Sequence, residues 1–179
     1  MTTEMWVIAV ARLAGSLPVL RWPFYGALLA LLVDQSDLFM MNLLHLGGVD
    51  GYQSFDKNLD QVYLLAFLIV ALRWDGPERT IAAGLYFYRF AGFVTFEVSQ
   101  TREVLLFFPN LFEVWFLLVA GRRHFGLPHV WQDRRLAWLT AGLVAGKLFQ
   151  EYAVHYARWL DGFTAVEAVE AIWHFFIPF

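Results

Sequence analysis

Carboxylate side chains recur at helical spacing within apolar stretches of this sequence. The stretch LLVDQSDLFMMNLL carries Asp34 and Asp37 one helical turn apart, and Asp56 and Asp60 follow four residues apart, so a helix places each pair on one face. Carboxylate oxygens are the ligands that Mg²⁺ and Mn²⁺ prefer. The four aspartates are therefore candidate metal ligands, and Asp34, Asp37 and Asp60 are also candidate catalytic acids or bases.

A second polar series lies further along the chain. Lys147, Glu151 and His155 stand at successive four-residue steps, which a helix places on one face. Glu151 and His155 are candidate catalytic residues, because a carboxylate beside an imidazole can exchange a proton near neutral pH. Arg89 lies within another apolar stretch, and we expect Arg89 and Lys147 to bind an anionic head group or to stabilise developing negative charge.

Asn110 and Glu113 complete the candidate site. They lie three residues apart in LLFFPNLFEVWFLL, directly after Pro109. Proline is expected to bend this helix and to free a backbone carbonyl for other partners. We predict that Asn110 and Glu113 belong to the substrate-binding part of the site.

The composition indicates that the elements positioning these residues lie in a bilayer. The chain has 179 residues, of which 59% are hydrophobic, 18% aromatic and 16% charged, and the mean hydropathy is +0.52. A soluble domain usually carries about 25% charged residues. The sequence therefore predicts one all-α integral membrane domain over residues 1–179, a polytopic helix bundle with about five spanning helices plus short N- and C-terminal helices.

The five predicted spans are separated by short breaks that contain Gly, Pro or charged residues. They lie at residues 24–44, 59–74, 80–98, 103–120 and 136–157. The terminal segments 5–20 and 163–177 are shorter, and each either spans the bilayer or lies flat in the interface. Arg12 interrupts the first of these two segments.

The distribution of arginine predicts the orientation. The loops 73–79 and 121–135 are rich in arginine, whereas the opposite connections carry fewer cations and more acids. Because positive residues are retained on the cytoplasmic side, we expect these loops to be cytoplasmic in a plasma (inner) membrane and residues 45–58 to face outward. The ionisable residues of all five spans then lie between the bilayer centre and the outer surface, which indicates one polar chamber that opens outward.

Acids outnumber obligate cations within the predicted spans. Arg89 and Lys147 face six acids, four more than they can neutralise: Asp34, Asp37, Asp60, Glu97, Glu113 and Glu151. A charge at the bilayer centre costs about 2.5–3.5 kcal/mol. The excess acids are therefore protonated, or the chamber holds a cation such as a divalent metal, a proton or an amine head group. The alternative is that the acids and cations pair with one another and only hold the helices together.

Other classes of function fit the sequence less well. The net charge of -3, without a basic stripe, argues against nucleic acid as a partner. The absence of cysteine excludes disulfides, thiolate catalysis and cysteine-based metal sites.

Three classes of function remain. The leading class is a lipid-modifying membrane enzyme, with membrane lipids as partners and a divalent metal as candidate cofactor. The second is a cation-coupled or proton-coupled carrier or sensor that uses the same acids to bind its ion. The third is a non-catalytic subunit of a larger membrane complex. A homodimer or a larger assembly fits a chain of this length.

Overall fold

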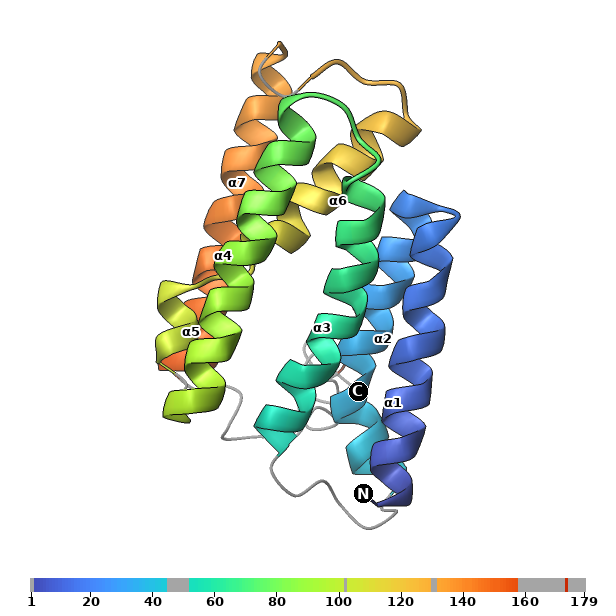
Figure 1. Ribbon diagram of the computed structural model, residues 1–179, viewed down its shortest axis with the longest axis vertical. Helices are drawn as coiled ribbons and strands as arrows, with labels where there is room; N and C mark the ends of the chain where they lie inside the picture. The colour runs from blue at the N-terminus through green and yellow to red at the C-terminus, as the bar shows by residue number, and fades with distance from the viewer. Residues whose placement is uncertain (1, 45–51, 102, 130–131, 158–172, 174–179) are drawn as a thin grey trace.

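Structure is described for residues 2–44, 52–101, 103–129, 132–157 and 173 in a computed structural model (Figure 1). The regular elements in these ranges are all helices, and no β-strand occurs among them. The prediction of an all-α fold is therefore confirmed for the described residues.

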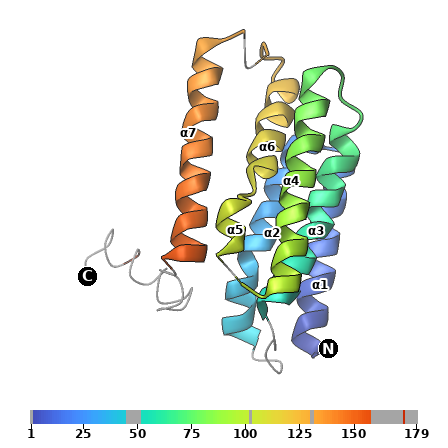
Figure 2. The same cartoon turned by 60° about the vertical axis from the view of Figure 1, so that its left-hand side comes forward.

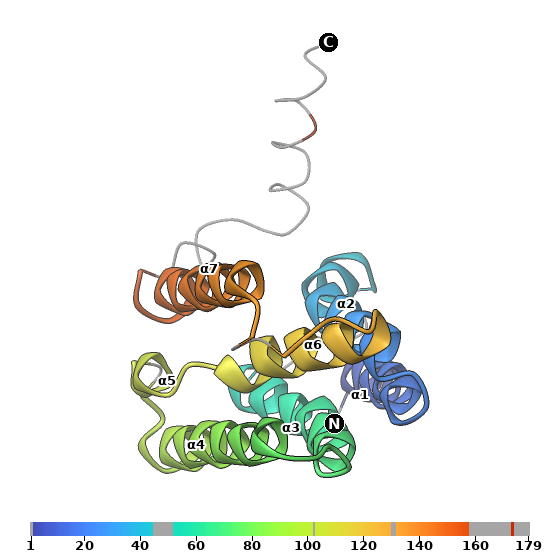
Figure 3. The same ribbon diagram turned by 90° about the horizontal axis from the view of Figure 1, so that it is seen from above.

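The described helices form an antiparallel bundle in which consecutive long helices run in opposite directions (Figure 1). Seen end-on, α6 lies in the middle and contacts α2, α3, α4 and α7 (Figure 3). Helix α7 stands at the outside of the bundle, beside α6 (Figure 2). The elements are α1 (Thr3–Ser16), η1 (Leu17–Leu20), α2 (Pro23–Leu44), α3 (Tyr52–Ala71), α4 (Pro77–Ser99), α5 (Val104–Phe107), α6 (Leu111–His124), α7 (Arg134–Glu151) and η2 (Tyr152–Tyr156).

The helices match the predicted apolar stretches with two differences. Helix α3 begins at Tyr52, several residues before the predicted start at 59, so that Asp56 and Asp60 both lie within it. The stretch 103–120 is divided into α5 and α6. The predicted helix at 163–177 lies outside the described residues, apart from Trp173.

The division between α5 and α6 follows from Pro109. Helix α5 ends at Phe107, and α6 begins at Leu111 with Asn110 as its N-cap, whose side chain accepts a hydrogen bond from the Glu113 backbone N–H. A proline has no N–H to donate and its ring clashes with the preceding turn, while an asparagine is a favourable N-cap. The predicted bend is therefore confirmed, and it is a complete interruption of the helix.

One helical segment in the described ranges is long and apolar enough to cross a membrane. It is Thr3–Leu20, formed by α1 and η1 near the N-terminus, with 18 residues and a mean hydropathy of 1.3. A buried helix of a soluble protein or a signal sequence can have the same length and composition. Length and composition therefore do not support a bundle of five spanning helices, partly because α3 and α4 each carry three or more charged residues.

An aromatic core fills one half of the bundle. Phe67, Phe112 and Phe116 are fully buried, and the rings of Phe67 and Phe116 stack with their centroids 4.1 Å apart. Trp74 stacks on Phe116 at 5.2 Å. This core lies toward what we name the arginine end of the bundle, where the turns after η1, α3 and α6 meet (Figure 1).

Charged side chains lie inside the bundle, while large apolar side chains cover much of its outside. The exposed apolar residues include Trp6 and Leu13 on α1, Phe87 and Val98 on α4, and Trp138 and Phe149 on α7. The buried charged residues are Glu4, Arg12, Asp60, Glu78, Arg89 and Glu151. Charged residues are rarely buried in soluble proteins unless they are paired. The chemistry available inside this bundle therefore depends on the residues that pair with these buried charges.

Candidate functional site

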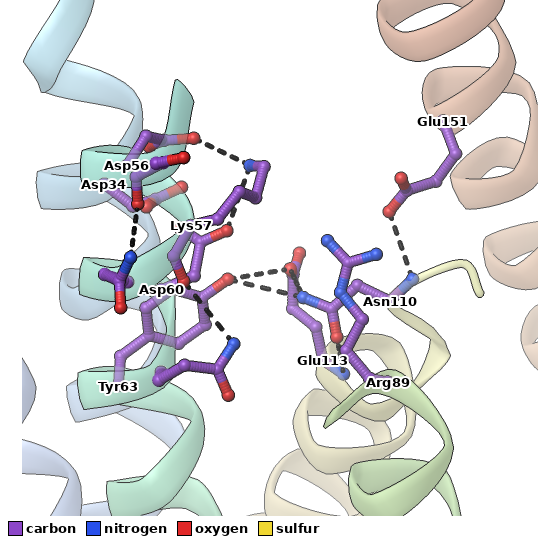
Figure 4. A network of polar contacts seen from close by, with 12 residues as sticks. Asp34, Asp56, Lys57, Asp60, Tyr63, Arg89, Asn110, Glu113 and Glu151 are labelled. Atoms are coloured by element: carbon purple, nitrogen blue, oxygen red, sulfur yellow. Dashed lines mark hydrogen bonds and ion pairs between the residues drawn. The ribbon is translucent and has the colours of Figure 1, made fainter. Parts of the chain in front are cut away.

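Three aspartates from two helices converge near the end of the bundle opposite the arginine end. Asp34 of α2 meets Asp56 and Asp60 of α3, and their carboxylate oxygens lie within 4.8 Å of one another (Figure 4). We name this group the tri-aspartate cluster. The sequence prediction that these carboxylates belong together is consistent with this arrangement.

Arg12 of α1 contacts all three aspartates of the tri-aspartate cluster. Its guanidinium Nη1 lies 2.6 Å from Oδ1 of Asp34 and 2.9 Å from Oδ1 of Asp60, and its Nη2 donates to Oδ1 of Asp56 at 2.5 Å. The Arg12 side chain is only 3% exposed. Arginine is suited to this position because its planar guanidinium presents several donors in a fixed geometry.

Lys57 supplies a second positive charge to the same cluster. Its ammonium Nζ lies 2.7 Å from Oδ2 of Asp56 and 3.1 Å from Oδ2 of Asp60. Hard oxygen ligands of this kind suit Mg²⁺ or Mn²⁺. However, Arg12 and Lys57 already contact the oxygen atoms that such an ion would use.

The role of Arg12 was missed in the sequence prediction. The segment that carries it was treated as a terminal helix of uncertain placement, and its partners are more than 20 residues away in sequence. The signal was nevertheless present, because Glu4, Ile8, Arg12 and Ser16 recur at four-residue steps and all four are buried on one face of α1. A charged residue that shares a helical face with a buried isoleucine is expected to point inward.

A second cluster of polar side chains joins α3, α6 and α7. Nδ2 of Asn110 donates to Oε2 of Glu113 at 3.0 Å and to the Tyr63 hydroxyl at 3.3 Å, while that hydroxyl donates to Oε2 of Glu113 at 3.5 Å (Figure 4). Tyr63 is 4% exposed. We name Tyr63, Asn110, Glu113, Lys147 and Glu151 the asparagine cluster.

Helix α7 contributes a cation and an acid to the asparagine cluster. Nζ of Lys147 lies 3.3 Å from Oε2 of Glu113 and 3.6 Å from Oε1 of Glu151. The Asn110 backbone N–H, left without a helical partner at the start of α6, donates to Oε1 of Glu151 at 3.1 Å. Lys147 and Glu151, which the sequence predicts on one face of a helix, therefore hold α7 against α6.

Arg89 of α4 binds the backbone that the proline break leaves free. Its Nη1 donates to the Phe108 carbonyl at 2.7 Å. In a continuous helix the missing N–H of Pro109 would instead leave the Leu105 carbonyl free, and that carbonyl accepts a hydrogen bond from the Phe108 N–H at 3.2 Å. Helix α4 and the segment around Phe108 approach closely here. A Cβ atom added to Gly92 would lie only 2.2 Å from Cβ of Phe108. Gly92 therefore lets α4 pack against this break.

The two clusters are neighbours along α3, because Asp60 and Tyr63 lie about one turn apart (Figure 4). We name the two clusters, together with Arg12, Lys57 and Arg89, the polar network. Glu97 lies apart from it, where its Oε1 accepts a hydrogen bond from Asn58. The side chains of Asp37 and His155 lie outside the described residues.

The charge balance of the network differs from the sequence estimate. Its described members comprise Asp34, Asp56, Asp60, Glu113 and Glu151 as acids, and Arg12, Lys57, Arg89 and Lys147 as cations. The excess of four acids therefore shrinks to one within this described set. Arg12 and Lys57, which the sequence analysis placed outside the five spans, lie within the network and account for two of the three charges. The third is a net loss of one acid, because Asp56 is added, Glu97 lies outside the network, and the side chain of Asp37 lies outside the described residues.

A separate group of charges surrounds Glu78 at the arginine end. Nη2 of Arg122 lies 2.7 Å from Oε1 of Glu78, Nε and Nη2 of Arg123 donate to Oε2 at 3.0 and 2.9 Å, and Nδ1 of His129 lies 3.0 Å from Oε1. We name these four residues the Glu78 cluster. Burial acts to raise the pKa of Glu78, but the hydrogen bonds from Arg122, Arg123 and His129 outweigh it and hold the pKa below its usual value.

Searches against family models, curated proteins and solved structures found no match for this chain. The fold and the site therefore define an all-α protein with a buried polar network, and its function has to be inferred from that network.

Proposed function

We propose that the chain is a polytopic membrane protein whose helices cross the bilayer as a bundle. The arrangement of the surface supports this, because tryptophan, phenylalanine and leucine side chains are exposed along α1, α4 and α7 while charged groups are buried. Intramembrane charges face the interior of a bundle and pair with one another. The arginine end would then be cytoplasmic, and the polar network would lie in the outer half of the bilayer.

We further propose that the polar network is the acid–base site of a lipid-modifying enzyme. The observation that carries this proposal is the contact of the Tyr63 hydroxyl, the Asn110 amide and the Glu113 carboxylate within 3.5 Å of one another between α3 and α6. A carboxylate linked to a phenol can pass a proton to or from a substrate. Lys147, 3.3 Å from Glu113, would stabilise negative charge that develops there.

In this proposal the tri-aspartate cluster positions the site and does not require a metal. Arg12 and Lys57 neutralise most of its charge and tie α1 and α2 to α3. The substrate would be an amphipathic lipid that enters from the bilayer and brings its polar group to Glu113. Glu151 would help to orient the site, since it accepts the hydrogen bond from the start of α6.

The aromatic core argues against the carrier interpretation. A carrier needs access to its site from both sides, and the stacked rings of Phe67, Phe116 and Trp74 fill the interior between Tyr63 and the arginine end. The second candidate function is a non-catalytic membrane subunit. It is favoured by the pairing of acids with internal cations throughout the network.

The test is lipid turnover by the full chain reconstituted in vesicles of a bacterial total polar lipid extract, followed by mass spectrometry of the lipids. We expect a lipid species to be converted by the wild type, and conversion to fall at least about a hundredfold in Glu113→Gln and Tyr63→Phe. Glu97→Gln serves as a control because Glu97 is an acid outside the network. Conversion that persists in both variants would overturn the acid–base site. No conversion by folded wild type would favour the non-catalytic subunit.

A further inference from the structure

A pocket of about 820 Å³ opens at the arginine end of the bundle, away from the polar network. Its lining residues belong to the turn before α4, to the C-terminal end of α6 and to the segment that follows α6. Figure 1 shows these segments at the same end of the bundle. Arg122, Arg123, His129 and Gln132 line it with donor groups, and Asp75 is the one acid among the described residues of its lining. The volume falls within the range of about 300–1,000 Å³ that is usual for organic ligands.

The Glu78 cluster holds the two arginines of this pocket in place. Glu78 is fully buried, its Oε2 accepts hydrogen bonds from Arg122 and Arg123, and its Oε1 lies 2.7 Å from Nη2 of Arg122. The guanidinium of Arg123 also lies 5.6 Å from the centre of the Trp74 ring, which favours a fixed orientation. Both guanidinium groups are therefore held in position before a ligand binds. Binding then loses less side-chain entropy.

One carboxylate cannot neutralise two guanidinium groups, so the cluster keeps a net positive charge. Two observations indicate that these arginines have hydrogen-bond donors that the protein itself does not use. Nε of Arg122 is buried and has no hydrogen-bond partner within the described residues, and the Arg123 side chain is 34% exposed. The N-terminus of α4, which has no side-chain cap, adds a partial positive charge at the same place.

We propose that this pocket binds a phosphate-bearing ligand at the cytoplasmic face, either a phospholipid head group or a water-soluble organic phosphate. Guanidinium groups bind phosphate oxygens in pairs of parallel hydrogen bonds. The pocket is larger than a phosphate ion needs, so it also holds the organic group that carries the phosphate. The proposal is independent of the acid–base site, because the aromatic core separates the two.

The experiment uses the full chain in detergent and native mass spectrometry. One arm titrates phosphatidic acid against phosphatidylcholine, and the other titrates inorganic phosphate with a thermal-shift readout at fixed ionic strength. We expect Arg123→Gln to weaken binding about tenfold or more. Arg123 is chosen because Arg122 still holds Glu78 in that variant. Asp75→Asn should strengthen binding, because it removes the acid from the lining.

The control is Arg79→Gln, which removes the same charge one residue after Glu78 but outside the pocket lining. Binding of phosphatidic acid without phosphate binding would assign a lipid head group, and saturable binding of both would assign a phosphate site open to soluble ligands. The proposal is overturned if Arg79→Gln weakens binding as much as Arg123→Gln, because the effect would then be general surface charge. It is also overturned if neither ligand binds, or if Asp75→Asn has no effect.

Discussion

Arg12 is the residue on which the tri-aspartate cluster depends. Removing it leaves three carboxylates whose oxygens lie within 4.8 Å of one another, with Lys57 as the remaining cation in contact with them among the described residues. We therefore expect Arg12→Gln to lower the free energy of unfolding by about 3–5 kcal/mol, as loss of one partner of a buried pair usually does. Denaturant unfolding in detergent micelles measures this, with Arg21→Gln at an exposed arginine as the control. A loss no larger than that of the control would contradict the role of Arg12.

The same variant tests whether the tri-aspartate cluster can accept a metal. With Arg12 present, we expect Mn²⁺ to leave the melting temperature unchanged, because the guanidinium occupies the carboxylate oxygens. In Arg12→Gln the three oxygens are available, and Mn²⁺ should restore part of the lost stability by binding only the folded state. Stabilisation of the wild type by Mn²⁺ would show instead that the metal displaces Arg12.

Glu78 gives the protein a pH-dependent contribution to stability. Its pKa in the folded protein lies below the usual value of 4.5, so the folded state favours the charged form. This contribution is fully present above about pH 4.5 and is lost as the pH falls through the lower folded pKa. We expect the stability difference between wild type and Glu78→Gln to be largest near neutral pH and to shrink on acidification toward pH 3. A difference that stays constant with pH would contradict this assignment.

Residue spacing predicted part of these sites. The i, i+4 spacing of Asp56 and Asp60 was enough to place them on one face, and the shared depth of Asp34 suggested the cluster. Arg12 and Glu78 were missed for a physical reason. Their partners are distant in sequence, and Glu78 lies in WDGPER, a segment whose Gly and Pro indicate only a turn.

At the scale of elements, the contact between α4 and the break before α6 depends on Gly92. A methyl group there would lie 2.2 Å from Cβ of Phe108, so the backbone must shift and the hydrogen bond of Arg89 to the Phe108 carbonyl must lengthen. We expect Gly92→Ala to destabilise the protein by about 1–3 kcal/mol. Gly84→Ala in the same helix is the control, since its added Cβ would meet no atom within 4 Å apart from its chain neighbours and the backbone of its own helix. It should stabilise slightly, because alanine favours helix.

The bend at Pro109 could be predicted, because a proline cannot continue a helix without loss of a hydrogen bond. The complete interruption of the helix and the early start of α3 were not predicted. The residues from Tyr52 to Asn58 are mostly polar, so apolar periodicity gives no signal there. Their helical structure depends on tertiary contacts such as that of Asp56 with Arg12.

At the scale of the whole molecule, the absence of cysteine allows a direct test of topology. Gln100 and Gln132 are exposed and lie beyond opposite ends of the bundle, after α4 and before α7. We expect Gln100→Cys to react with a membrane-impermeant maleimide in intact cells and Gln132→Cys to react only after permeabilisation. Labelling of both positions in intact cells would contradict the proposed orientation, and labelling of both in a soluble fraction would contradict membrane insertion.

In α3, the charged residues that face the interior of the bundle are also the ones that lower the mean hydropathy of the helix. Asp56, Lys57 and Asp60 are turned toward Arg12 and one another, but an average over sequence counts them as if they faced outward. The average therefore underestimates how apolar the outside of such a helix is.

The aromatic core also has an electrical consequence. A membrane voltage does work on a charge only over the part of the field that the charge crosses, about 2.3 kcal/mol for a full crossing at 100 mV. In the proposed orientation, a proton that reaches Glu113 from outside crosses only part of the field, because Phe67, Phe116 and Trp74 fill the interior between the polar network and the arginine end. A voltage that a potassium gradient with valinomycin imposes on the vesicles should therefore change lipid conversion by less than the factor that a full crossing would give.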